Sequence, residues 1–161
     1  MSRPVRRALV AVALLLAGTL AAAVPSDAAV QSVPTLTAIR TGNNPGFDRV
    51  VLDFGDGATP TVSYRLTDEL TADPSGEIVW LTGEYFINVA VSHATYHDDN
   101  GNPTYPGPQK FRTRNLANVM AVALTGDFEA QVTVGLGVRS RTAVNVFTLT
   151  SPNRVVIDVA H

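Results

Sequence analysis

The feature that most constrains this 161-residue chain is the alternation of short apolar segments with turn residues. After the N-terminal region, no segment holds a 3.6-residue apolar period long enough for a helix. Strong turn signals separate the segments: Asn43-Asn44-Pro45-Gly46, Gly55-Asp56-Gly57, Asp73-Pro74-Ser75-Gly76 and Ser151-Pro152-Asn153. Many short strands between such signals are typical of all-β proteins. We therefore expect one all-β domain, a β-sandwich or a partly closed barrel.

The strands that this pattern predicts are Leu36–Thr41, Arg49–Phe54, Thr61–Leu66, Ile78–Leu81, Tyr85–His93, Val119–Leu124, Gln131–Leu136, Val144–Thr150 and Arg154–Val159. A long irregular stretch, rich in Gly, Pro, Asn and Asp, runs from Tyr96 to Arg114. Loops of that length are often functional. Trp80 lies in an apolar run, and we interpret it as a core residue.

Two of the predicted strands share one pattern. Residues 49–54 and 154–159 both read Arg, Val, Val, aliphatic, Asp, apolar. Because alternate residues of a strand face opposite sides, one face of each strand is apolar throughout. These expected core faces are Val50, Leu52 and Phe54 in the first strand, and Val155, Ile157 and Val159 in the second.

The charges of the two strands suggest how they pair. In one antiparallel register Arg49 meets Asp158 and Arg154 meets Asp53. We expect this double ion pair to fix the register between the beginning and the end of the domain. The alternative is that each strand keeps its own solvated charges. A charge swap between Asp53 and Arg154 that fails to rescue the single variants would contradict the second pair.

Residues 1–29 have the features of an export signal. Arg3, Arg6 and Arg7 supply a positive start, Ala8–Ala23 form an apolar run, and small residues follow at Ser26 and Ala28. The run is short for a membrane span, which needs about 20 predominantly apolar residues. We therefore expect cleavage near Ala29, a secreted or envelope location, and no stable membrane anchor, although an uncleaved anchor is the alternative. Residues 30–161 then form a single domain.

Composition narrows the partners of that domain. The chain contains no cysteine, so neither a disulfide nor a lipid on an N-terminal cysteine is available, and a hydrophobic core must supply the stability. Residues 30–161 carry nine Lys and Arg against thirteen Asp and Glu, a net charge of −4. This balance argues against nucleic acid and against an anionic membrane surface as partners.

Metal binding has little support in the sequence. His93 and His97 would be about 13 Å apart on one strand, too far to share an ion. Asp98, Asn100 and Asn102 have an alternating oxygen spacing that could suit Ca²⁺, but the full loop pattern with its closing Glu is absent. A turn held by Asx hydrogen bonds is the preferred interpretation. We expect no metal and no cofactor.

Catalytic signatures are equally sparse. No Cys, no Gly-x-Ser-x-Gly and no Ser-x-x-Lys occurs, and a set of zinc ligands for an amidase cannot be assembled. The carboxylate pairs Asp68/Glu69 and Asp127/Glu129 satisfy only the minimal requirement of a glycosidase. We therefore expect a protein that is not an enzyme, with a wall-glycan hydrolase as the lesser alternative.

The most suggestive surface residues are basic. Lys110, Arg112 and Arg114 would share one face if extended, and so would Arg139 and Arg141. Arginine grips carboxylates and phosphates, which bacterial wall polymers carry, in bidentate fashion. Tyr105 lies in a Pro- and Gly-framed loop that could present it to a sugar face. These six residues are the predicted ligand site. The alternative is a solvated edge strand protected by its charges.

The chain resembles a known family. The Arg-Val-Val segments, Leu36–Gly42, Pro103–Pro108, Leu124–Glu129 and Gly135-Leu136-Gly137 together resemble the AMIN-like domain of secreted actinobacterial proteins, across residues 35–161. AMIN domains proper are β-sheet modules attached to wall amidases and secretins, and they localise those proteins in the envelope. The resemblance implies a wall-associated module that binds peptidoglycan. Because no second domain accompanies the module here, we do not expect it to be the targeting arm of a fused enzyme.

A second function of a different class is open at this point. An exposed sheet edge can accept a strand from another protein, which would make the domain a protein–protein adaptor of the envelope. The partner is then either a cell-wall polymer or an envelope protein. Charge reversal at Arg112 and Arg114 separates the two, because polymer binding would weaken and strand pairing would barely change.

Overall fold

The computed structural model describes residues 31–161, so the predicted signal, residues 1–29, lies outside the described part. The strands are β1 (Leu36–Asn44), β2 (Phe47–Phe54), β3 (Thr61–Thr67), β4 (Tyr85–Ser92), β5 (Lys110–Arg112), β6 (Val119–Phe128), β7 (Gln131–Val138), β8 (Val144–Leu149) and β9 (Arg154–Ala160). No helix occurs in residues 31–161, and none there is long and apolar enough to cross a membrane.

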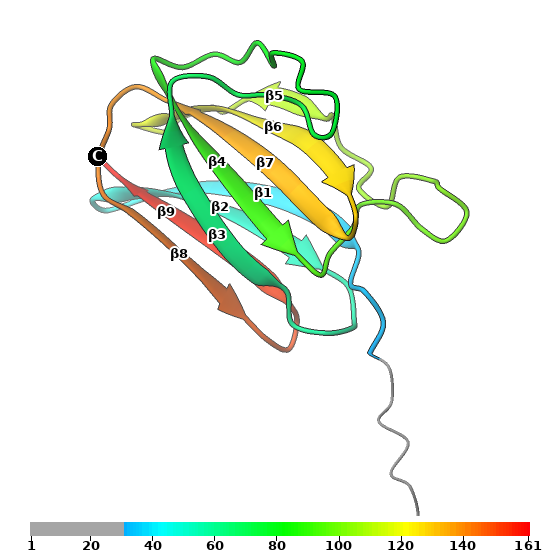
Figure 1. Ribbon diagram of the computed structural model, residues 1–161. Helices are drawn as coiled ribbons and strands as arrows, with labels where there is room; N and C mark the ends of the chain where they lie inside the picture. Colours follow the sequence, from blue (N-terminus) through cyan, green and yellow to red (C-terminus); the bar gives the residue numbers. More distant parts are fainter. Residues whose placement is uncertain (1–30) are drawn as a thin grey trace, which may run out of the picture.

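The strands form two antiparallel sheets that face each other (Figure 1). One sheet has four strands in the order β1-β2-β9-β8, and the other has five in the order β3-β4-β7-β6-β5. The Tyr64 hydroxyl on β3 donates a hydrogen bond to the Val144 carbonyl on β8, 3.1 Å away, but the two strands do not form a ladder. The fold is therefore a β-sandwich and not a closed barrel, which confirms the prediction of an all-β sandwich.

Eight of the nine predicted strands occur, with ends shifted by a few residues. The β1–β2 hairpin continues to a two-residue turn at Pro45 and Gly46, because Gly46 accepts the positive φ of 85° that this turn requires. The ninth prediction, a strand at Ile78–Leu81, is wrong. Only Ile78 forms an isolated bridge, with Thr71, inside a long connection between β3 and β4.

The core lies between the inner faces of the sheets. Val50, Leu52 and Phe54 of β2 and Val155, Ile157 and Val159 of β9 are all buried, so the predicted core faces are confirmed. They pack in one cluster with the inward residues of β4 and β7, among them Ile87, Val89, Val134 and Leu136. Alternation along each strand thus places one apolar face against another.

The predicted register between β2 and β9 is confirmed, with Arg49 opposite Asp158 and Asp53 opposite Arg154. Of the two predicted ion pairs only one forms. Arg49 binds Asp158 through two bonds of 2.7 Å, whereas Asp53 is bound by Arg40 of β1, the other neighbour of β2. The prediction of the second pair was wrong because Asp53 has a neighbouring arginine on each side, Arg40 on β1 and Arg154 on β9. A register derived from β2 and β9 alone takes no account of β1.

The connection between β3 and β4, residues 68–84, crosses the outer face of the five-stranded sheet (Figure 1). We call it the strap. Leu70 is 1% exposed and lies over Gly135, and the Thr82 carbonyl lies over Gly137, where no side chain intervenes. The Asp73 N–H donates to the Thr125 carbonyl, 2.8 Å away. Small residues on β6 and β7 therefore allow the backbone of the strap to approach the sheet closely.

Candidate functional site

Strand β5 carries the two best-placed cations of the predicted site. It is the edge of the five-stranded sheet and pairs with β6, with Lys110 opposite Ala123 and Arg112 opposite Ala121. Phe111 points inward and packs against the core cluster. The pleat therefore puts Lys110 and Arg112 on the outer face together, where both are exposed.

An open hollow of about 310 Å³ lies between these cations and the strap. Its lining is Trp80, Leu81, Thr82, Lys110, Phe111, Arg112 and Ala121. The Lys110 ammonium donates a hydrogen bond to the Trp80 carbonyl, 3.0 Å away, which ties the strap to the edge strand. The small side chain of Ala121 leaves the space above β6 open. The result is one surface with an aromatic ring and two cations, which we call the Trp80 surface: Trp80, Lys110 and Arg112.

Trp80 is 80% exposed, so the interpretation of Trp80 as a core residue was wrong. The strap reaches the sheet through Leu70 and through backbone atoms, and these contacts fill the space over the glycines of β7. Ile78 in the same run is also exposed, at 48%. A large exposed aromatic side chain leaves apolar area in water, which is typical of a contact surface for a partner. The sequence signal was ambiguous, because a short apolar run between turn residues occurs both in buried strands and in exposed connections.

Two loops at one end of the sandwich hold the remaining predicted cations. The buried Asp48 carboxylate on β2 accepts N–H groups from Ala117, Asn118 and Val119, at 2.6–3.1 Å. The Asn118 side chain in turn donates to the carbonyls of Ser140 and Ala160. These bonds fix the loop before β6 and the loop after β7 to the body of the domain.

Arg114 and Arg139 occupy these loops. Arg114 follows the end of β5, so it does not continue the alternation of Lys110 and Arg112 on the strand. Arg139 follows β7, and its Nε donates to the Ala117 carbonyl, 3.0 Å away. Both residues are exposed, and the Arg139 bond links the two loops.

Arg141 stabilises the start of the strap. Its guanidinium pairs with Asp68 and lies 4.7 Å from the centroid of the Tyr85 ring. Asp68 offsets the charge of Arg141. Residues 139–141 lie outside any strand, so Arg139 and Arg141 do not form the second extended cationic face that alternation suggested.

Tyr105 packs partly against the core cluster rather than standing out of its loop. Its ring closely approaches Gly107, where a Cβ would lie 2.2 Å from the tyrosine oxygen. Burial raises the pKa of Tyr105 above its ordinary value. Neighbouring Thr104 donates its hydroxyl hydrogen to the Leu36 carbonyl at 2.7 Å, which fastens this loop to β1. Tyr105 does not line the hollow beside Trp80.

His97 and Asp98 of the long loop have structural partners. The side chain of Asp127, 6% exposed, binds the His97 Nδ1 at 2.7 Å and accepts from Tyr96 and Thr95. The Asp98 carboxylate accepts the N–H groups of Asn100 and Asn102, so the predicted Asx turn is confirmed. These bonds, that of Asn102 first, lower the pKa of Asp98. Within residues 31–161 no group of three or more His, Cys, Asp or Glu is placed to hold a metal.

One carboxylate of each predicted pair is therefore committed to structural contacts. Asp127 holds three groups of the loop that follows β4, and Asp68 pairs with Arg141. In contrast, the Trp80 surface presents a ring and two cations to solvent. This arrangement is suited to holding a ligand with both apolar and anionic parts.

These observations define a β-sandwich whose edge strand and strap present an aromatic and basic surface. The model of the AMIN-like domain family matches residues 34–161, and the chain belongs to that family. Membership indicates a module of the cell envelope, of a kind that is generally not catalytic. No curated protein and no solved structure matches the chain.

Proposed function

We propose that this protein is exported into the envelope of an actinobacterium, after cleavage near residue 29, and binds cell-wall polymer there without acting as an enzyme. Peptidoglycan is the ligand that the family resemblance favours. The observation that carries the proposal is the exposed Trp80 ring beside Lys110 and Arg112 on an edge strand. A ring offers a face to a sugar, and the cations attract the carboxylates and phosphates of the polymer.

The charges of the domain support a local site rather than general attraction. The domain is acidic overall, so a polymer with negative groups is repelled by most of its surface. Lys110, Arg112 and Arg114 lie within five residues of one another and oppose that repulsion at one edge. Binding through this edge therefore depends on salt, because added ions screen exposed charges beyond about 10 Å.

The test is sedimentation of residues 30–161 with purified, insoluble cell wall across a series of salt concentrations. This segment contains both sheets and the whole region that matches the family. We expect the protein to sediment with the wall at low salt and to be released as salt rises. Trp80→Ala and Arg112→Gln should each weaken binding by about tenfold, the size of one good contact.

Arg40→Gln is the matched control, because it removes the same charge from the opposite sheet. It should leave sedimentation unchanged. A protein that stays in solution at low salt contradicts the proposal. Sedimentation that changes neither with salt nor in the Trp80→Ala and Arg112→Gln variants favours the adaptor function, in which an edge strand pairs with a wall-bound protein.

A further inference from the structure

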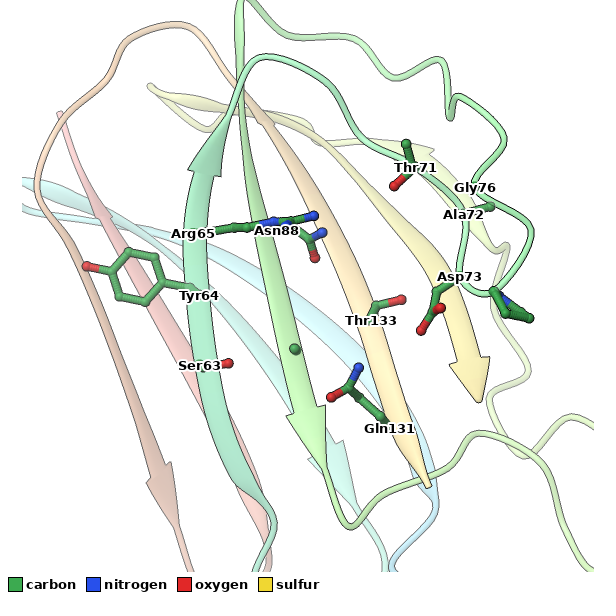
Figure 2. A pocket seen from close by; sticks show the side chains of 12 residues that line it. Ser63, Tyr64, Arg65, Thr71, Ala72, Asp73, Gly76, Asn88, Gln131 and Thr133 are labelled. Carbon is green, nitrogen blue, oxygen red and sulfur yellow. The ribbon is translucent and has the colours of Figure 1, made fainter. Parts of the chain in front are cut away.

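A second hollow lies on the outer face of the five-stranded sheet, between β3 and the strap (Figure 2). Its volume is about 420 Å³, and we call it the polar groove. Asn88 of β4 and Thr133 and Gln131 of β7 form its floor. Arg65 of β3 and Asp73 of the strap lie on opposite sides. It shares no lining residue with the hollow beside Trp80.

Several polar groups of the groove have no partner within residues 31–161. The Arg65 guanidinium and the Asp73 carboxylate form no ion pair there, and the Asn88 amide forms no side-chain hydrogen bond. The Thr133 hydroxyl is buried and without a hydrogen-bond partner. The Thr133 oxygen is itself covered, so the side chains that the groove offers to a ligand are those of Arg65, Asp73 and Asn88.

The strand register sets the distance between the two charges. Asp73 bridges to Gly126 of β6, and β6 lies three strands from β3, a spacing of about 14 Å. The Arg65 side chain extends from β3 toward Asn88 on β4 (Figure 2). It crosses one spacing and leaves about 10 Å to Asp73, which a peptide of two or three residues spans with a hydrogen bond of about 2.8 Å at each end.

We propose that the polar groove binds a short peptide, about two or three residues long, with a free ammonium group and a free carboxylate. Arg65 forms a fork of two hydrogen bonds to the carboxylate, and Asp73 binds the ammonium. The amide side chains of Asn88 and Gln131 exchange hydrogen bonds with the backbone of the peptide.

A peptide suits this groove better than a sugar. Tyr64 is the aromatic residue in the lining, and its ring points away from the groove toward β8, where its hydroxyl binds the Val144 carbonyl. A sugar ring would therefore find no stacking surface. A polyanion is disfavoured because Asp73 would repel it. If the proposed function holds, the groove takes the peptide part of the wall and the Trp80 surface takes the glycan, and this division of roles rests on that function.

The experiment is an NMR titration of residues 30–161 with trialanine that has free ends. We expect the side-chain amide signals of Asn88 and Gln131 to shift as the peptide binds, at concentrations up to about 10 mM. Trialanine with an acetylated N-terminus and an amidated C-terminus should bind at least about tenfold more weakly, because both charged contacts are lost. The indole signal of Trp80, the one tryptophan of the chain, reports on the other surface.

Arg65→Gln and Asp73→Asn should each lower the affinity for free trialanine by about tenfold. Arg65 is exposed, so its variant keeps the fold, and Arg40→Gln and Asp99→Asn are the matched controls. Equal affinity for free and blocked trialanine, no shift at Asn88 and Gln131, or a shift at the Trp80 indole alone would each overturn the proposal. Trialanine binding without wall sedimentation would instead contradict only the proposed function.

Discussion

Arg49 and Arg154 occupy equivalent positions in two strands with the same sequence pattern, but their surroundings differ. Arg49 forms its ion pair with Asp158 and lies 5.1 Å from the centroid of the Phe47 ring. The hydrogen bonds to Asp158 raise the pKa of Arg49. The Arg154 Nε is buried without a hydrogen-bond partner in the described part of the chain. At the scale of single residues, strand β1 decides which of the two equivalent arginines keeps its ion pair, because Arg40 of β1 binds Asp53.

This difference predicts unequal coupling. A double-mutant cycle with Arg49→Gln and Asp158→Asn should give a coupling energy of about 0.5–1 kcal/mol, as partly exposed pairs do. The same cycle with Arg154→Gln and Asp53→Asn should give a value near zero, because Asp53 is bound by Arg40. Urea unfolding of the wild type, the four single variants and the two double variants measures both cycles. Equal coupling in the two cycles would contradict the pairing described here.

At the scale of elements, the strap depends on glycines that belong to another part of the chain. The Thr82 carbonyl lies 2.0 Å from the position that a Cβ of Gly137 would take. Leu70 lies 2.5 Å from the corresponding position on Gly135. A side chain on Gly137 would meet the backbone of the strap and lift it from the sheet, whereas one on Gly135 would displace the end of the Leu70 side chain. Because the strap carries both Trp80 and Asp73, it contributes to both proposed binding sites.

We therefore expect Gly137→Ala to destabilise the domain by about 1–3 kcal/mol, the usual range for an overpacked site. It should also weaken binding to cell wall, since the displaced strap moves Trp80 away from Lys110. Denaturant unfolding and wall sedimentation measure the two effects. Gly42→Ala is the control, because a Cβ there meets nothing within 4 Å. Unchanged stability of Gly137→Ala would contradict the described contact between strap and sheet.

At the scale of the whole molecule, the long loop after β4 closes one side of the sandwich. Tyr96 and Tyr105 of this loop pack against the core cluster, and Asp127 of β6 holds the backbone of Tyr96. Burial first, and the charge of Asp127 second, raise the pKa of Tyr96 above 10.0. The fold therefore favours the neutral form of these rings, and its stability is coupled to their protonation.

The sign of this coupling predicts a loss of stability in alkali. A group whose pKa is raised by folding contributes fully below its unfolded pKa, about 10 for tyrosine, and loses its contribution as the pH rises through the folded value. Thermal unfolding should therefore show a falling Tm above about pH 10. Tyr96→Phe should reduce the slope of that fall, whereas Tyr85→Phe, which removes an exposed hydroxyl, serves as the control. An equal slope in all three proteins would show that the loss of stability in alkali does not come from Tyr96.

The two proposed sites could be predicted from local sequence patterns only in part. Alternation predicted that Lys110 and Arg112 share a face, and they do, but Arg114 follows the strand's end. The exposed position of Trp80 was not predictable, because a run of apolar residues does not reveal what lies beneath it. The groove between Arg65 and Asp73 was not predicted either. Its two charges come from different elements, and only the sheet order places them on opposite sides of one hollow.

The sequence by itself determined the all-β class, eight strands, the core faces of β2 and β9, and their register. These properties are local or pairwise, because the period of two along a strand and the match of two patterns are written in the chain. The tertiary structure decided which carboxylate each arginine binds, where the strap crosses, and why Leu70 is buried while Trp80 is exposed. Those outcomes depend on free space at glycines and alanines of distant strands, which no local pattern records.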